Sequence, residues 1–135
     1  MKQPKIGVGV FLTKLNINGD VFILVGKRKS PHGENKWELP GGALEYEETI
    51  IDCGLRELKE ETGITDVEVH CAREFTEDIF EDSHWVSFFV HATCKWNTEA
   101  SLMESNKCKE WRWVTLDDLK QNYDLFLPLK NFLCN

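Results

Sequence analysis

Three glutamates that could bind a metal ion lie close together in residues 42–64, GALEYEETIIDCGLRELKEETGI. Glu57, Glu60 and Glu61 have helical spacing, and a rotation of about 100° per residue brings their carboxylates to one side of a helix. Clustered carboxylate oxygens are the ligands that a hard ion such as Mg²⁺ requires. The stretch therefore predicts a divalent-metal site carried by a helix.

The same stretch contains the residues that would build and orient that helix. Ile51, Leu55 and Leu58 recur at spacings of four and three residues, which predicts one buried apolar face. Glu47 and Glu48 suit the start of the helix, because negative charge is favourable near the positive end of the helix dipole. Gly63, the last residue but one of the stretch, is a stop signal for the helix. The metal-binding carboxylates would then lie on a different face from the packed residues.

Three features would lower the stability of this helix if packing were its only role. Glu60 and Glu61 stand at the C-terminal end, where the dipole disfavours anions. Glu57 and Glu61 form a like-charged i,i+4 pair, which costs roughly 0.2–0.5 kcal/mol. Gly54 costs about 1 kcal/mol relative to alanine inside a helix. A solvated acidic face is the ordinary interpretation of a Glu-rich helix, but these features together favour a functional site in which a cation offsets the repulsion.

Fixed spacings extend through the whole stretch. Five residues separate Gly42 from Glu48, seven separate Glu48 from Arg56, and Glu57 follows directly. With the later glutamates and the closing glycine, the stretch matches every fixed position of the Nudix box, G-x5-E-x7-R-E-U-x-E-E-x-G-U with U aliphatic. The sequence therefore strongly resembles the Nudix hydrolase superfamily, over about a sixth of its length.

The resemblance implies an α/β fold, the Nudix-type α/β/α sandwich with a mixed β-sheet, as a single domain over residues 1–135 with the box at 42–64. The pattern along the chain agrees with this fold. An Asn-Gly turn between two apolar segments predicts a hairpin of residues 6–13 and 21–25. Residues 84–94 are apolar on both faces, which predicts a buried central strand.

The remaining elements are predicted from shorter signals. Residues 66–72 read as a strand and residues 73–82 as an edge strand that runs into a loop. Residues 110–114 form a further predicted strand, and Thr115 is a suitable N-cap for a short helix over residues 116–120. Residues 125–133 predict a C-terminal helix with a proline in its first turn.

The resemblance also assigns roles to residues of the expected site. It implies bound Mg²⁺, with Mn²⁺ as a substitute, and a carboxylate that acts as the general base. Family members differ in which carboxylate this is, so Glu57, Glu61 and Glu110 all stand as candidates. Glu110 is included because it resembles a glutamate just before a tryptophan in MutT-like enzymes. The implied metal ligands are the Gly41 carbonyl, Glu57, Glu60, Glu61 and Glu110. The implied catalytic residues are Arg56, Glu57, Glu61 and Glu110, with Glu45 placed to pair with Arg56 and aim Glu57.

A basic cluster directly follows the second predicted strand. Lys27, Arg28 and Lys29 lie in the sequence GKRK, the densest group of cations in the chain. A solvated strand end and a contact to substrate phosphate or base both remain open from the residues alone. GKRK followed by a short loop and W-x-L-P-G-G is similar to the small MutT-like nucleoside triphosphate hydrolases, which favours the substrate contact.

Apolar and aromatic residues supply candidates for a base pocket. Trp85 lies on the predicted central strand, where core packing is the alternative role. The segment LFLPLKNFL near the C-terminus resembles the base-reading segment of small nucleotide-pool enzymes, which points to Phe126, Leu127 and Leu129. A tryptophan often stands in the family where this chain has Leu127, so the resemblance does not fix the base.

The implied reaction is hydrolysis of a nucleoside triphosphate, including oxidised or otherwise modified ones, to a nucleoside monophosphate and pyrophosphate. One alternative is hydrolysis of another diphosphate, in a dinucleotide, a nucleotide sugar or a non-nucleotide. Another is a non-catalytic Nudix-like sensor domain, although such domains usually lose glutamates of the box. No proline lies between Pro40 and Pro128, unlike the ADP-ribose pyrophosphatases, which carry one shortly after the box.

Composition limits the setting in which the chain works. A net charge of −7 argues against a general binder of polymeric nucleic acid or of membranes. Five scattered cysteines show no zinc spacing, and reduced thiols in the cytoplasm are the expected state. The start of the chain does not resemble a signal peptide, and no apolar run reaches the length of a membrane span. The expected partner is a small nucleotide, with a homodimer left open.

Overall fold

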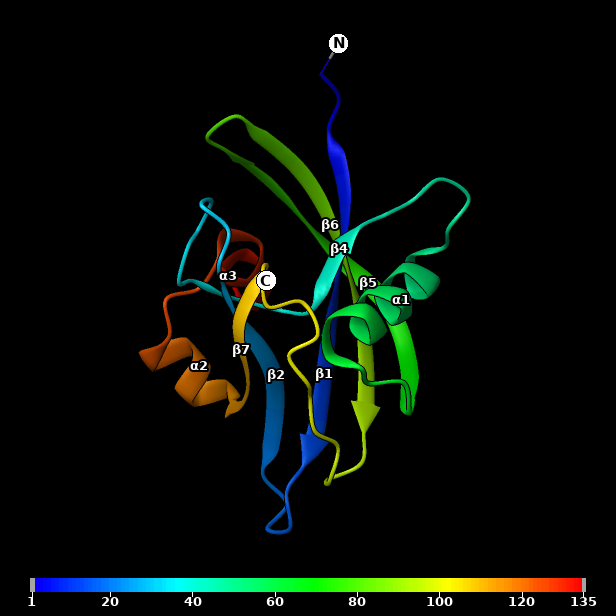
Figure 1. Cartoon of the computed structure of the whole chain (residues 1–135), viewed down its shortest axis with the longest axis vertical. Coiled ribbons are helices and arrows are strands. Elements are labelled where there is room, and N and C mark those ends of the chain that lie inside the picture. The colour runs from blue at the N-terminus through cyan, green and yellow to red at the C-terminus, as the bar shows by residue number, and fades with distance from the viewer. Residues whose placement is uncertain (1, 135) are drawn as a thin grey trace.

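The computed structural model describes residues 2–134, so the two end residues of the predicted domain at 1–135 lie outside it. It contains seven strands and three helices within this range (Figure 1). The strands are β1 (Lys5–Leu15), β2 (Val21–Arg28), β3 (Trp37–Glu38), β4 (Gly41–Ala43), β5 (Val67–Phe80), β6 (Ser83–Cys94) and β7 (Cys108–Thr115). The helices are α1 (Ile50–Thr62), α2 (Leu116–Asn122) and α3 (Leu127–Leu133).

The strands form one mixed sheet. Its main order is β3-β2-β1-β6-β5, with β4 paired to β1 and β7 paired to β2. β1 and β6 are parallel, whereas the other pairs are antiparallel. β1 pairs with β4 near its start and with β2 near its end, so the sheet divides beside β1. This division brings β4 and the residues that follow it next to α1.

Two apolar cores lie on the two faces of the sheet. On one face α1 covers a cluster that includes Val10, Leu58 and Val90. On the other face α2 and α3 cover a second cluster that includes Phe89 and Leu119. The helices thus enclose the sheet from both sides (Figure 1), which confirms the predicted α/β/α sandwich with a mixed sheet.

Several local predictions are confirmed. The Asn-Gly segment closes the β1–β2 hairpin, where the Asn16 side chain accepts hydrogen bonds from two backbone N–H groups, those of Asn18 and Asp20. The Thr115 side chain accepts from the N–H of Asp118 and caps α2. β6 lies between β1 and β5, as predicted from its apolar faces.

Other local predictions need correction. The segments predicted as two strands, 66–72 and 73–82, form one strand of 14 residues, β5, which lies at the sheet edge and is followed by a turn at residues 81–82, as predicted for the second segment. Two irregularities in its register, one of them beside Glu74 at φ 69°, interrupt the alternation that would have indicated a single strand. β3 and β4 were not predicted as strands, because two or three residues are too few to show a period.

The first residues of α1 also differ from the prediction. The helix begins at Ile50 with Thr49 as its N-cap, whose side chain accepts from the N–H of Asp52, so Glu47 and Glu48 precede the first turn and do not lie within it. At the other end Gly63 adopts φ 77° and its N–H donates to Lys59, so the predicted stop signal is confirmed. A Cβ at Gly54 would lie 3.0 Å from a methyl group of Val90, so glycine lets the helix approach the sheet closely.

All five cysteines are free thiols, and none is paired with another. Within residues 2–134, no helix has the length and apolar character needed to cross a membrane.

Candidate active site

Glu57 lies against the start of the strand–helix connection. A Cβ at Gly42 would come within 2.4 Å of the Glu57 carboxyl carbon, so only glycine leaves room for this side chain. Arg56 donates a hydrogen bond of 2.8 Å to the Glu57 carboxylate. Burial nevertheless raises the pKa of Glu57, and the positive charge of Arg56 only partly opposes this effect. Glu57 is therefore held in one orientation beside β4.

Glu61 occupies the neighbouring position one helical turn later. Its carboxylate accepts a hydrogen bond of 2.8 Å from the backbone N–H of Gly41. Burial raises the pKa of Glu61 to about 8, and the charges of Glu38, Glu57 and Glu104 add to the effect. The Gly41 hydrogen bond acts in the opposite direction. A carboxylate with this environment is a strong candidate for a cation ligand, because a bound cation would offset both burial and repulsion.

Arg56 binds glutamates of the segment that precedes α1. It forms hydrogen bonds of 2.7 and 3.0 Å with the two oxygens of Glu48, and Glu45 lies 3.7 Å away. Hydrogen bonding from Arg56 holds the pKa of Glu48 at about 2. The predicted contact of Glu45 with Arg56 is thus present, but Glu48 is the nearer partner. Arg56 is therefore a positioning residue: its hydrogen bonds link Glu57 of α1 to Glu48 of the segment between β4 and α1.

Glu104 is the acid that the sequence analysis missed. It lies in the irregular segment before β7, and this segment is attached to the end of α1 because the N–H groups of Ser101 and Met103 donate to the carbonyls of Thr62 and Glu61. Oε1 of Glu104 is buried and has no hydrogen-bond partner among residues 2–134. The only sequence signal is a single acid after two apolar residues, Leu-Met-Glu, within a polar segment.

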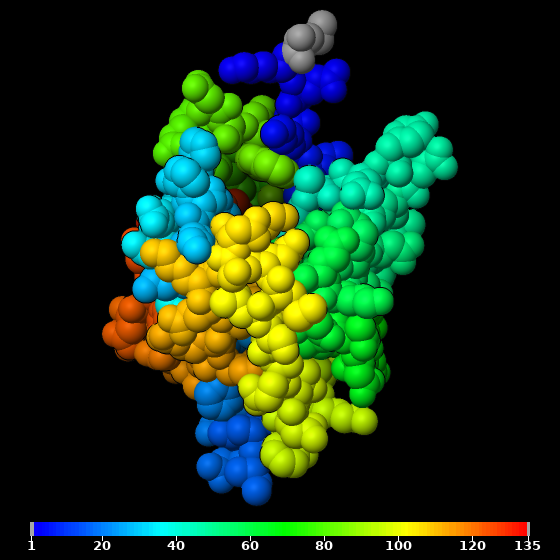
Figure 2. All heavy atoms as spheres, in the orientation of Figure 1, coloured from blue at the N-terminus to red at the C-terminus, as the bar shows by residue number. Residues whose placement is uncertain are grey.

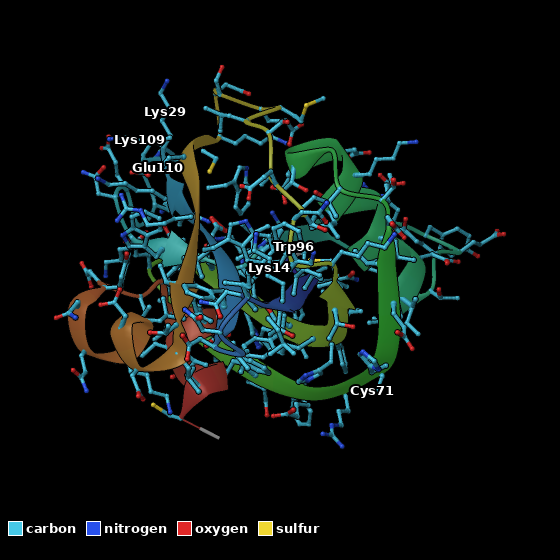
Figure 3. All side chains as sticks on the ribbon, turned by 90° about the horizontal axis from the view of Figure 1, so that it is seen from below. Lys14, Lys29, Cys71, Trp96, Lys109 and Glu110 are labelled. Carbon is cyan, nitrogen blue, oxygen red and sulfur yellow. The ribbon has the colours of Figure 1, made fainter. Side chains whose placement is uncertain are left out.

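Glu110 is placed away from the carboxylates of the box. The side chain of Trp111 reaches α1 and donates to the Glu61 carbonyl, and alternation along β7 turns Glu110 to the opposite face. There both carboxylate oxygens of Glu110 accept hydrogen bonds of 3.0 Å from Arg112. Figure 3 shows Glu110 on the side of β7 away from α1. The structure therefore does not bring this predicted ligand together with Glu57 and Glu61.

The carboxylates do not form a preassembled cage. In the part of the chain that the structure describes, no three His, Cys, Asp or Glu side chains converge closely enough to constitute one. Glu60 is half exposed and contacts Arg56 at 3.4 Å, and Glu61 is turned towards the Gly41 N–H. A metal ion would therefore need side-chain rotations of Glu60 and Glu61 to complete its ligand set.

The predicted basic cluster is divided among several contacts. Arg28 donates hydrogen bonds of 2.8 and 2.9 Å to Glu38 and lies 3.8 Å from the ring centre of Phe126. Lys27 lies over the ring of Trp37 at 6.0 Å, on the other side of β2. Lys29 donates to the carbonyl of Ser105 at 3.2 Å. Arg28 is consequently fully engaged by protein groups, whereas Lys29 lies at the segment that carries Glu104.

The residues predicted to contact the base have different degrees of exposure. Trp85 is half-buried and packs beside Gly7, where an added Cβ would lie 3.3 Å from its ring. Phe126 is half-buried and meets the edge of Phe80, with 5.7 Å between ring centres. Leu127 is half-buried as well. Leu129 has 2% of its surface exposed and belongs to the core under α3, so it cannot touch a ligand without rearrangement.

Figure 2 shows a hollow near these residues, bordered by the cyan loop at residues 29–36, the yellow segment before β7 and the β5–β6 hairpin. A separate cavity, about 820 Å³, lies at the far end of the hairpin formed by β1 and β2. It is lined by Lys14, Leu15, Ile17, Val21 and Trp96, among others, and by no residue of the box. The acidic group and the hollow therefore mark the candidate active site.

Comparison with known proteins identifies the family of the chain. The family model described as NUDIX domain matches residues 3–134, so the chain belongs to the Nudix family. The 8-oxo-dGTP diphosphatase of Proteus vulgaris is 38% identical over 99 residues, which cover 73% of this chain and 82% of that protein. A crystal structure of a MutT NUDIX hydrolase from Burkholderia pseudomallei is 27% identical, with a TM-score of 0.77 and coverage of 98% and 97%.

Longer relatives also match. Nudix hydrolase 2 of Arabidopsis thaliana is 28% identical over 125 residues, which cover 90% of this chain but 44% of that protein. The chain thus spans less than half the length of this curated relative. The family resemblance drawn from residues 42–64 is confirmed by these matches.

Proposed function

We propose that this chain hydrolyses nucleoside triphosphates, including oxidised or otherwise modified ones, to a nucleoside monophosphate and pyrophosphate in a Mg²⁺-dependent reaction. The observation that carries the proposal is the half-buried acidic group of Glu57, Glu61 and Glu104, in which Gly42 leaves room for Glu57 and the Gly41 N–H holds Glu61. The similarity to a protein named 8-oxo-dGTP diphosphatase supports the substrate class. A small nucleotide in the cytoplasm is the proposed substrate, and neither polymeric nucleic acid nor a membrane is required.

The donor set fits a hard divalent cation. Glu57, Glu61 and Glu104 would supply carboxylate oxygens, and the unpartnered Oε1 of Glu104 is available for such a bond. Glu60 and the Gly41 carbonyl complete the proposed ligands. When bound, Mg²⁺ would neutralise charge on the phosphoryl oxygens and lower the pKa of bound water. Glu110 is left out of this set because it is paired with Arg112 on the opposite face of β7.

Residues of the chain orient the carboxylates and accept the proton of the attacking water. Arg56 fixes Glu57 through a 2.8 Å hydrogen bond, and the Gly41 N–H fixes Glu61. Glu57, Glu61 and Glu104 are the candidates for the base that accepts the proton of the attacking water. The charge of Glu60 raises the pKa of Glu57, and the charges of Glu38, Glu57 and Glu104 raise the pKa of Glu61.

The nucleoside end of the substrate is proposed to occupy the hollow beside the acidic group. Trp85, Phe126 and Leu127 would provide its apolar walls, because each is only half-buried in the structure. Lys29 would lie at the phosphate end, beside the segment that carries Glu104. The nucleobase of the substrate remains unassigned, since the apolar walls accept any ring of suitable size.

The proposal is tested by product analysis. The chain is incubated in Mg²⁺ with canonical, oxidised and methylated nucleoside triphosphates, with a dinucleotide polyphosphate and with ADP-ribose. We expect pyrophosphate and a nucleoside monophosphate from at least one triphosphate, and no turnover in excess EDTA. Faster turnover of a dinucleotide or of ADP-ribose would replace the proposed substrate class, and no turnover of any compound would favour a sensor domain.

The position of bond cleavage is tested in ¹⁸O-labelled water. Attack at the β-phosphorus puts the label in pyrophosphate and leaves the monophosphate unlabelled, and we expect this result. Label in the monophosphate would mean attack at the α-phosphorus. Orthophosphate and a diphosphate as the main products would reject both versions.

A further inference from the structure

A tight turn before β7 brings a lysine next to the acidic group. The carbonyl of Glu104 accepts hydrogen bonds from the N–H groups of Lys107 and Cys108, at 3.0 and 3.2 Å. This turn brings the Lys107 ammonium to 3.7 Å from the Glu104 carboxylate. The Lys107 side chain is 61% exposed, so its three donors are largely available to a ligand.

The turn itself is fixed from two sides. The N–H of Lys29 donates to the Lys107 carbonyl at 3.0 Å, and the Lys29 ammonium donates to the Ser105 carbonyl at 3.2 Å. On the other side, Met103 N–H is bonded to the Glu61 carbonyl at 3.3 Å. The backbone position of Lys107 is therefore determined by the same segment that positions Glu104.

Neighbouring cations have other partners. Arg28 is held by Glu38 and Phe126, and Lys109 is held by Asn35 at 2.5 Å and Glu34 at 3.5 Å. Lys107 is different because its one ion-pair partner in the described range, Glu104, belongs to the proposed metal site. The positive charge of Lys107 also lowers the pKa of Glu57, so Lys107 acts electrostatically on a second carboxylate of that site.

We propose that Lys107 binds the phosphate chain of the substrate at the edge of the site formed by Glu57, Glu61 and Glu104. This inference rests on the proposed function and assigns to Lys107 the role that the sequence analysis gave to the GKRK cluster. Lysine suits the task because its ammonium is a mobile point charge with three donors. Binding of a metal ion by Glu104 would free Lys107 to turn from the carboxylate to a phosphate oxygen.

The test uses Lys107→Met and Lys107→Arg in the full chain, with Lys109→Met as the matched control. Binding of inorganic pyrophosphate in excess Mg²⁺ and binding of Mg²⁺ alone are measured by calorimetry. We expect Lys107→Met to weaken pyrophosphate binding by about tenfold, as for loss of one charge-assisted hydrogen bond. Mg²⁺ alone should bind with equal or higher affinity, because a cation near the carboxylates has been removed. Lys107→Arg should restore most of the pyrophosphate affinity.

These opposite changes separate a phosphate ligand from a structural lysine. If Lys107→Met leaves pyrophosphate binding within twofold of the value for Lys109→Met, the inference about Lys107 is overturned while the proposed function stands. Equal weakening of Mg²⁺ and pyrophosphate would also overturn it, since that pattern means a disturbed metal site. If the unmodified chain neither binds pyrophosphate nor hydrolyses a nucleoside triphosphate, the proposed function and this inference both fail.

Discussion

The two ends of α1 place glutamates in opposite electrostatic settings. At the start, Glu48 accepts two hydrogen bonds from Arg56, and its pKa is about 2. At the end, Glu61 is buried beside other acids and accepts one backbone hydrogen bond, and its pKa is about 8. The same residue type is therefore a stable anion at one end and a proton-holding group at the other, without a metal ion.

This difference separates structural from chemical roles within one motif. Glu48 has its counterion within the protein, so its charge supports the connection between β4 and α1. Glu61 forms no ion pair with a cation of residues 2–134, so its environment is favourable only when an external cation or a proton is present. Locally unfavourable groups of this kind are expected at sites that bind ligands.

Glu61→Gln should show the largest effect, on activity. We expect kcat to fall by about 10³-fold, because a charged group that stabilises the transition state is replaced by a neutral one. The melting temperature without metal should hold near pH 7, because protonated Glu61 and glutamine are both neutral, and it should rise above pH 8, where one of several neighbouring like charges disappears. Steady-state kinetics with thermal melts checks both. A strongly lowered melting temperature would show that Glu61 is structural, like Glu48.

Glu104→Gln should rank second and tests whether the acidic group extends beyond the helix. We expect about 10²-fold lower activity, as for loss of one ligand or electrostatic group. Glu110→Gln is the matched control and should stay within about threefold, because Glu110 faces Arg112. The reverse ranking of the two variants would show that Glu110, and not Glu104, completes the site.

The pH dependence of stability should distinguish the two ends of α1. In the folded chain Glu61 keeps a proton up to about pH 8, whereas in the unfolded chain it releases the proton near its ordinary value of 4.5. Its contribution is therefore fully present below about pH 4.5 and is lost as pH rises to about 8, on the order of a few kcal/mol. Glu48 has the opposite sign, and its contribution is lost as pH falls from 4.5 towards 2.

Denaturation in EDTA across this pH range measures the effect. The stability difference between the unmodified chain and Glu61→Gln should change between pH 5 and pH 8 in the direction given above, and Mg²⁺ should raise stability most at the alkaline end. A pH-independent difference would mean that Glu61 is ionised throughout, as Glu48 is.

Glu48→Gln should have the smallest effect on activity and a visible effect on stability. Arg56 would lose its closest partner, so we expect a melting temperature lower by several degrees and activity reduced by about 10-fold through misplacement of Glu57. Glu47→Gln is the control, because Glu47 is exposed and close in the sequence. A loss of activity as large as that of Glu61→Gln would remove the distinction between the two ends.

The sequence by itself determined much of the helix that carries the site. The helix period and Gly63 are local signals, and they predicted the helix and its end correctly because period and capping depend on neighbours within a few residues. Of the predicted apolar face, Leu58 is buried and Ile51 packs against the core, whereas Leu55 is half-buried and lies outside the core cluster. The N-cap Thr49 was not predicted, although threonine is a common residue at this position. Family spacing also gave the sandwich fold, and the Asn-Gly turn gave the first hairpin.

Only the tertiary structure decided which residues from outside the box meet it. Glu104 lies in a polar segment without a period, and it reaches Glu61 through backbone bonds formed after the segment folds over α1. Glu110 resembles a family ligand in sequence, but strand alternation next to Trp111 turns it to the other face. Likewise, the three adjacent cations of GKRK look equivalent in sequence, but Glu38 engages Arg28, and a cation outside this cluster, Lys107, lies beside Glu104. Such contacts depend on long-range packing, which neither residue type nor spacing encodes.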